Sequence, residues 1–202
     1  MATRTFDSAK GRNENYWVKV SCQSLGVEII ADMPEETTTA VGSEWEGFLP
    51  ASIGSVSNAA ETIVKTITGS GAVYQYNTQQ IWVNSSPMEI PITLQFDTTR
   101  DAAQDVYIPM RLLELMALPR EAGGFLYSPG TNSGLIAGGD SSISLHIGKH
   151  LNIPRVIVVS VNSSFDSRLD KNGYPISGRS DITFRTDRVL SIDDWKKYTG
   201  VS

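Results

Sequence analysis

Acidic side chains surround one Asn-Gly step in the stretch SSFDSRLDKNGYPISGRSDITFRT, residues 163–186. A loop of this kind binds Ca²⁺ when oxygen ligands alternate along it, with a glycine at the sixth position and a glutamate at the twelfth. Counted from Asp166, the third, sixth and twelfth positions hold Arg168, Lys171 and Ser177. The calcium pattern is therefore broken. Because two β-type runs flank Asn172-Gly173, a favoured turn dipeptide, the stretch predicts a long hairpin or extended β-arch instead.

The two histidines, His146 and His150, are four residues apart, a spacing that on a helix lets both bind one metal ion. The residues around His146 alternate between apolar and polar as in a strand, and Gly148 interrupts the segment. The helix that this site requires is therefore not expected. The single cysteine, Cys22, excludes a cysteine-based zinc site and an internal disulfide. We expect neither a metal site nor a cofactor.

Signatures of nucleophilic and phosphate-binding enzymes are missing as well. In GTNSG, Ser133 stands directly before the last glycine and not at the centre of a G-x-S-x-G elbow. Gly148-Lys149 lacks both the earlier glycine and the following Ser or Thr of a phosphate-binding loop. A catalytic constellation would have to combine distant residues such as His146, Asp166 and Asp170. We therefore expect a protein that is not an enzyme, with no catalytic residues to assign.

Four tryptophans remain as candidate binding residues: Trp17, Trp45, Trp82 and Trp195. Exposed tryptophans can form a platform that stacks on sugars, or the centre of a protein interface. Most tryptophans, however, simply belong to a hydrophobic core. The sequence leaves both interpretations open.

The elements that would position these residues are mainly strands. Period-two alternation of apolar and polar residues predicts half-buried strands at 88–96, 142–147 and 181–185. The run VIVVSV, residues 156–161, is apolar on both faces and predicts a central strand. NYWVKVSC and GVEII, near the amino terminus, predict a further pair of strands.

Two short helices complete the expected elements. Pro109 suits the first turn of a helix that ends before Pro119, and residues 101–106 add a turn or two before it. This helix is so apolar that it should be covered nearly all round, by the core or by a partner. A second helix follows Ser191, a good N-cap residue, near the carboxyl terminus. The predicted fold is therefore mainly β with short helices, in the α+β class.

One domain over residues 1–202 is the expectation for a chain of this length. Residues 61–83 predict a hairpin, because two β-type runs are separated by a short loop that contains glycine. Residues 32–60 and 120–140 are low in periodicity and predict long connections, which in a compact domain are usually functional or bound to a partner.

The composition narrows the classes of partner. A net charge of −5 argues against a surface that binds nucleic acid. No signal peptide and no apolar run long enough to span a membrane are visible, so we expect a soluble protein of a reducing cell.

The carboxyl-terminal half resembles a known family. IPITLQFDTTRDAAQDVYIPMRLLELMALP, then LYSPGTNSG, then ISLHIGKHLNIPRVIVVSVNSSFDSRLDKNGYPISGRSDITFRT resemble the baseplate tail-tube proteins of contractile-tailed bacteriophages, the tube initiator and tube-cap group. The resemblance covers roughly residues 86–195 and rests on the order and spacing of these segments. It implies a tail-tube-like β-barrel or sandwich with a flanking helix.

The resemblance also implies a function. Six copies would form a ring of the tail tube that joins hub and tube and templates tube assembly, in a virion made in the host cytoplasm. The implied partners are other copies of the chain, neighbouring tail-tube and baseplate hub proteins, and the tape measure protein and DNA, which pass through the lumen without specific binding. Hairpins 61–83 and 156–186 are candidates for ring closure, and connections 32–60 and 120–140 for contacts along the tube axis. No contact with a membrane is implied.

A rival interpretation is a carbohydrate-binding β-sandwich at a tail tip, with Trp45 and Trp82 as the stacking platform. This interpretation predicts a monomer or trimer that binds glycans, whereas the tail-tube interpretation predicts a ring.

Overall fold

A computed structural model describes residues 3–8, 17–32, 37–47, 80–122, 124–129 and 143–201. The chain divides into a larger unit, residues 1–40 and 87–202, and a smaller unit, residues 41–86, and each is described by itself. Within the described residues, the larger unit contains a seven-stranded sheet, a short ribbon and helices, and the smaller unit contains a two-stranded ribbon. The chain is thus mainly β with short helices, as the alternation predicts. A single domain over residues 1–202 stays a prediction.

The strands of the large sheet lie in the order β1 (Arg4–Asp7), β3 (Val27–Asp32), β2 (Trp17–Cys22), β9 (Ile143–Ile147), β10 (Leu151–Phe165), β11 (Ser177–Thr186) and β6 (Glu89–Asp97). Only the β1–β3 pair is parallel. The predicted strands at 88–96, 142–147 and 181–185 are confirmed as β6, β9 and β11, and the amino-terminal pair as β2 and β3. Strand β10 lies inside the sheet order, but within the run 156–161, predicted as a central strand, only Val156 is paired on both sides, with β9 and β11, and the later residues pair with β11 alone.

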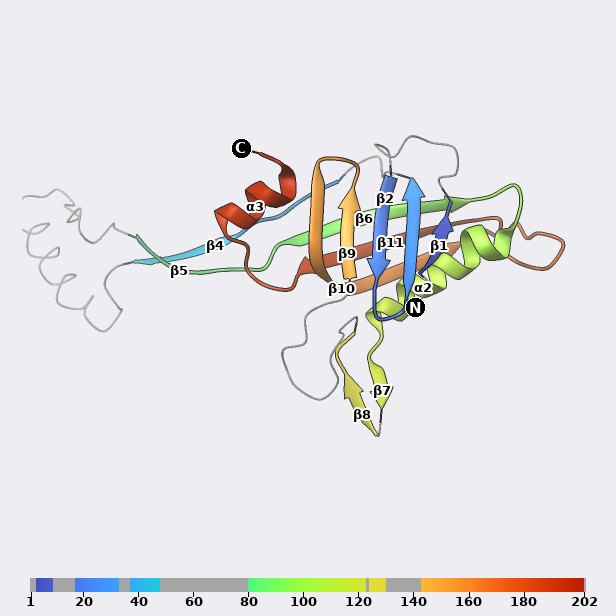
Figure 1. Ribbon diagram of the computed structural model, residues 1–202, viewed down its shortest axis with the longest axis horizontal. Coiled ribbons are helices and arrows are strands. Elements are labelled where there is room, and N and C mark those ends of the chain that lie inside the picture. The colour runs from blue at the N-terminus through green and yellow to red at the C-terminus, as the bar shows by residue number, and fades with distance from the viewer. Residues whose placement is uncertain are drawn as a thin grey trace, which may run out of the picture. The chain divides into compact units, whose positions relative to one another are not determined.

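Strand β10 bends the sheet. Its first part pairs with β9 and its second part with β11, and its register shifts between Ile153 and Val156 and again between Val158 and Ser160. Pro154, which cannot donate a backbone hydrogen bond, lies in the first irregularity. Figure 1 shows the result: β6, β11 and the second part of β10 run across the direction of β9, β2 and β3. The sheet therefore curls into a half-barrel.

Alternating apolar residues of both halves face the core. Met88, just before β6, and the β6 residues Ile90, Ile92, Leu94 and Phe96 are at most 3% exposed. Ile29 of β3, Leu145 of β9 and Phe184 of β11 are fully buried in the same cluster. The intervening side chains, among them Glu89 and Gln95, point to the other face, as the period-two pattern predicts.

Helix α2 (Ile108–Ala117) packs against this core and is preceded by a turn of π-helix, η3 (Ala103–Tyr107). Both confirm the predicted helix and its extra turn. The buried face consists of Val106, Pro109, Met110, Leu113 and Met116. Within the described part of the chain the core covers one side of this helix, since Leu115 is 50% exposed and Leu118, just beyond its end, 58%. Cover of the other side by a partner stays a prediction.

Helix α3 (Ile192–Thr199) begins at Ser191, the predicted N-cap, and ends at Gly200, whose φ of +70° favours glycine. Two short ribbons involve the predicted connections. β4 (Ser43–Gly47), within residues 32–60, pairs with β5 (Gln80–Ser85), which lies outside them, and β7 (Arg120–Ala122) pairs with β8 (Phe125–Tyr127), both within residues 120–140. Of the predicted hairpin 61–83, only residues 80–83 are among those described, and they belong to β5.

Candidate assembly surfaces

The stretch first considered for a metal is the tip of the β10–β11 hairpin, which confirms the hairpin prediction. Asp170 organises this tip: its Oδ1 accepts hydrogen bonds from the backbone N–H groups of Asn172 (2.8 Å) and Tyr174 (2.9 Å). Gly173, with φ of +83°, donates to the Asp170 carbonyl at 3.1 Å. The Asp170 carboxylate therefore acts as a turn-forming group. Among the described residues, no three His, Cys, Asp or Glu side chains group as metal ligands would.

Aromatic rings fix the base of this hairpin to helix α2. The guanidinium of Arg111 lies 4.9 Å from the ring centroid of Phe165 and 5.3 Å from that of Tyr107. Glu114 accepts a hydrogen bond from the same guanidinium at 2.7 Å. Tyr107 in turn lies 5.4 Å from Tyr174 at the hairpin tip. The cation–π contacts of Arg111 and the aromatic contacts of Tyr107 therefore join the hairpin to α2 and to the π-helical turn before it.

The outer face of β6, β11 and β10 is polar and carries a shallow groove of about 420 Å³. The lining residues are Thr38, Pro91, Ile92, Thr93, Ser160, Asn162, Asp181, Ile182 and Thr183. Asp181 accepts hydrogen bonds from the Thr93 hydroxyl (2.6 Å) and from Arg179 (2.8 Å). These two partners, Thr93 first, lower the pKa of the Asp181 carboxyl. The charge of Asp181 is therefore already paired with that of Arg179.

The far edge of β6 has no strand of the large sheet beside it, since β6 is the last strand in the order. One bridge reaches it: the backbone N–H of Ala40 donates to the Glu89 carbonyl at 3.2 Å. The other outer strand of the same sheet is the four-residue β1. The described sheet thus ends in two open strand edges, a feature that the sequence analysis did not identify.

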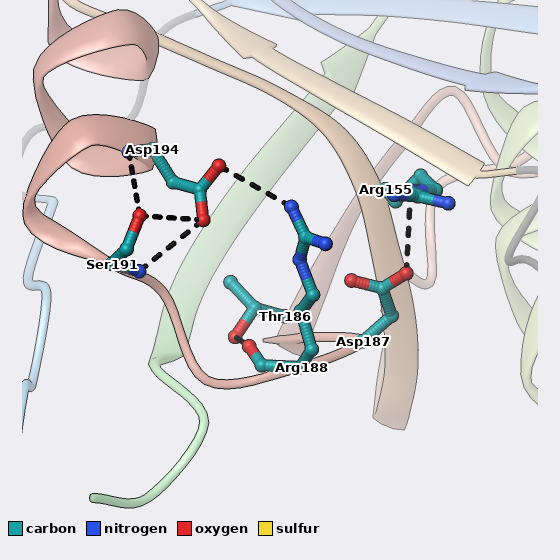
Figure 2. Close-up of polar contacts among 6 residues, drawn as sticks. All are labelled: Arg155, Thr186, Asp187, Arg188, Ser191 and Asp194. Atoms are coloured by element: carbon teal, nitrogen blue, oxygen red, sulfur yellow. Dashed lines mark hydrogen bonds and ion pairs between the residues drawn. The ribbon is translucent and has the colours of Figure 1, made fainter.

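Polar contacts join the first turn of helix α3 to the segment that follows β11, and that segment to β10 (Figure 2). Ser191 and Asp194 form a capping box, in which Ser191 Oγ accepts from the Asp194 N–H at 3.1 Å. Arg188 Nη2 contacts Asp194 Oδ1 at 3.3 Å, and Arg155 Nε contacts Asp187 Oδ2 at 3.4 Å. No residue of α3 is fully buried, although Trp195 and Tyr198 pack partly against the core. The helix is therefore held at the surface both by the polar contacts of its first turn and by the packing of Trp195 and Tyr198.

In the smaller unit, the structure brings two of the four tryptophans together. Trp45 of β4 lies directly opposite Trp82 of β5, so both side chains share one face of the ribbon. Trp45 is 56% and Trp82 53% exposed. Trp82 Nε1 donates to the Ser85 hydroxyl at 3.0 Å, and Ser85 Oγ lies 3.1 Å from Ser43 Oγ. An exposed aromatic pair with adjacent hydroxyls is the feature that the carbohydrate interpretation requires.

The remaining sequence candidates lie apart. His146 is half-buried in β9, where burial and then Lys19 lower its pKa, while His150 is exposed in the following turn. His146 pairs with Asn152 near the start of β10, whereas Asp166 follows the end of that strand, so the structure does not assemble the distant constellation.

Exposed apolar side chains also collect on and after helix α2. Leu115 and Leu118 are joined by Phe125 (66% exposed) and Leu126 (73% exposed) of the β7–β8 ribbon. Exposed apolar side chains are typical of interaction sites where they form a contiguous patch, which makes this segment a candidate.

Comparisons with known proteins do not identify a family: no family model matches the chain, and no curated protein is significantly similar to it. Within the described residues, no helix has both the length and the apolar character needed to cross a membrane. The tail-tube resemblance of residues 86–195 stays a prediction.

Proposed function

We propose that this chain is a structural protein of a phage tail baseplate, six copies of which form a ring of the tail tube. The observation that carries the proposal is the curled sheet that ends in two open edges, at β1 and β6. A barrel that closes on itself has no edges, and exposed edges are normally protected. Two different edges on one subunit favour head-to-tail contacts, which form a ring when the rotation closes.

The sheet order adds two candidates for ring closure, the outer strands β1 and β6. Within the predicted hairpin 156–186, β11 is paired along both sides, whereas residues 157–165 of β10 are paired with β11 alone, so the hairpin stays a candidate. In the proposed ring the outer strands β1 and β6 close the circle, and the hairpin contributes its tip. The part of hairpin 61–83 that precedes Gln80 lies outside the described residues.

Contacts along the tube axis are proposed for the two ribbons. β4 lies within residues 32–60 and the β7–β8 ribbon within 120–140, the connections expected to touch neighbouring tube and hub proteins. Both ribbons expose large apolar side chains, such as Trp45 and Phe125, which are enriched at protein interfaces. In the proposed ring, the ribbons of the six subunits would together form the surface on which the next ring of the tube assembles.

The lumen of the proposed ring would pass the tape measure protein and DNA without holding them. A net charge of −5 supports this, because affinity for phosphates requires clustered basic residues. On the outer face of β6 and β11, Arg179 is paired with Asp181 (2.8 Å) and Arg185 with Glu89 (3.6 Å), so these cations are already neutralised.

The test is electron microscopy of purified tails labelled with an antibody against this chain, combined with quantitative mass spectrometry. The proposal expects label at the baseplate end and six copies, or a small multiple of six, per tail. Tails without label, or label on peripheral fibres at trimeric stoichiometry, would overturn it.

A second candidate, a carbohydrate-binding module at a tail tip, is favoured by one observation, the pairing of Trp45 with Trp82 on an exposed face. It expects the tryptophan fluorescence of the purified protein to shift on titration with host-surface polysaccharide. Trp45→Ala and Trp82→Ala should each abolish the shift, and Trp195→Phe, on helix α3, should retain it. A saturable shift unaffected by the ribbon variants, or no shift, would contradict this candidate.

A further inference from the structure

The direction of the backbone groups in β6 can be read from three hydrogen bonds. Met88 O accepts from the Thr186 N–H at 3.0 Å, and the Thr98 N–H donates to Ile176 O at 3.1 Å, so even-numbered residues face β11. Glu89 O, by contrast, accepts from Ala40 on the opposite side. The register between β6 and β11 has no shift. The odd-numbered residues of β6 therefore present their backbone groups to the open edge.

This edge is divided into two parts by Pro91. Before it, Ala40 bridges Glu89, and Thr38 lines the groove beside Pro91. Pro91 has no N–H to offer at its outward position, so it interrupts any ladder there. Beyond it, Thr93, Gln95 and Asp97 present N–H and C=O groups to which no described residue is hydrogen-bonded. A free segment of five residues, Thr93–Asp97, remains.

The other end of the sheet supplies a strand of matching length. β1 spans four residues, Arg4–Asp7. The Arg4 N–H donates to Gly26 O (2.9 Å) and the Ser8 N–H to Ile30 O (3.0 Å), so even-numbered residues of β1 face β3. Thr5 therefore directs its backbone N–H and C=O away from the sheet.

The two faces of these strands also match. Phe6 is 7% exposed and pairs with the fully buried Ile29, so Phe6 lies on the core side of β1. On β6, Leu94 and Phe96 lie on the core side, while Gln95 lies on the polar side with Thr5 on the corresponding side of β1. Aligning Phe6 of one copy with Leu94 of another joins apolar to apolar and polar to polar.

We infer that residues Thr93–Asp97 of β6 pair with strand β1 of a second copy of this chain, which extends one sheet from subunit to subunit. This inference rests on the proposed ring, since it names the surface that closes it. It also assigns a role to Pro91, which limits pairing within the chain to the first part of β6 and leaves the second part for the neighbour.

Disulfide trapping tests the pairing directly. The double variant Thr5→Cys/Gln95→Cys places thiols on the polar faces of the two edges. The native Cys22 is only 1% exposed and serves as an internal reference for a thiol that the oxidant does not reach. Mild oxidation of isolated tails, and of concentrated purified protein, should give a ladder of linked chains that ends at six on a non-reducing gel. The matched control is Thr5→Cys/Asn152→Cys, since Asn152 is exposed on β10, inside the sheet. It should stay monomeric on the gel.

A backbone variant provides an independent test. Gln95→Pro removes only an outward N–H and should leave the β6–β11 bonds intact, whereas Leu94→Pro removes an inward one. The inference expects Gln95→Pro to melt within a few degrees of the wild type but to lose assembly at least tenfold, with Gln95→Ala assembling normally. Leu94→Pro should fail to fold.

The outcomes separate the two proposals. A ladder in purified protein without label on tails would support the strand pairing and overturn the phage function. Label on tails without a ladder, and with Gln95→Pro incorporated normally, would overturn the strand pairing alone. Equal ladders from the test and control cysteine pairs would also overturn it.

Discussion

Gly178 in strand β11 sets how closely helix α2 approaches the sheet. A Cβ at this position would overlap Met110 Sδ and lie 2.9 Å from Met110 Cε and 3.2 Å from Ser164 O. Since Met110 is fully buried, its side chain has little room to move. We expect Gly178→Ala to lower the free energy of unfolding by about 1–3 kcal/mol.

Urea unfolding of the single and double variants measures this effect. Met110→Ala should remove most of the additional cost of Gly178→Ala, so the two substitutions should be strongly non-additive. Additive effects would show that the contact is not the cause.

The capping box at Ser191 holds the pKa of Asp194 below its usual range. Its carboxylate accepts a hydrogen bond first from the Ser191 backbone N–H and then from the Ser191 hydroxyl, with Arg188 adding a favourable charge. A lowered carboxyl pKa contributes stability above about pH 4, the value of an unperturbed Asp, and loses it as the pH falls through the lower folded value. The first turn of helix α3 should therefore lose this stabilisation as the pH falls through the folded pKa of Asp194.

We expect Ser191→Ala to raise the pKa of Asp194 toward its ordinary value, because one of its donors is lost. Carbon-detected NMR titration of the Asp194 carboxyl measures the change. Thr199→Val, which removes the hydroxyl that donates to the Trp195 carbonyl at the other end of the helix, should leave it unaltered. An unchanged pKa in Ser191→Ala would contradict this account of the cap.

One side of helix α2 is buried and the other is exposed, and Leu113 and Leu115 allow the contribution of each side to stability to be compared. Leu113 is 1% exposed against the core and Leu115 is 50% exposed. We expect Leu113→Ala to cost about 2–5 kcal/mol in unfolding free energy, because it leaves a cavity. Leu115→Ala should change the stability of the isolated chain by less than about 0.5 kcal/mol. Chemical denaturation of both variants tests the orientation of the helix, and similar costs would refute it.

Leu115 then reports on assembly. If the exposed side of α2 faces a neighbour in the tail, Leu115→Ala should reduce incorporation into tails without changing the melting temperature of the free chain.

At the scale of the whole molecule, the sequence predicts where the strands and helices lie along the chain better than it predicts which strands pair with each other. Met88 to Phe96 and the Asn172-Gly173 turn could be recognised because alternation and turn chemistry are local signals. The pairing of Trp45 with Trp82 could not, because the two strands are far apart in the chain and SEWEG lacks a clear apolar alternation. The open edges could not be found either, since they depend on the order of all strands.

One local prediction also missed a physical detail. The run 156–161 is apolar on both faces and predicts a strand that is buried on both faces, yet Val159 is 41% exposed. Val159 follows the buried Val158, so by alternation it points to the opposite face of the sheet. The register shift between Val158 and Ser160 then leaves Ser160 exposed as well, and such irregularities have no clear sequence signal. The same holds for the candidate surfaces. The sequence shows which exposed residues could contribute to them, but not which of these residues the fold brings together.

Because strand β10 belongs to both halves of the curled sheet, it also couples their folding. β9 pairs with its first part through a short turn, whereas β2, which pairs with β9, and β6, which pairs with β11, come from distant segments of the chain, and such distant pairings form slowly. Neither half has a complete set of hydrogen bonds without β10. In native-state hydrogen exchange, the β10 amides that bond to β9 and those that bond to β11 should open with the same free energy, in one cooperative event. Two distinct opening energies would mean that the halves unfold separately and that the bend at Pro154 is a hinge.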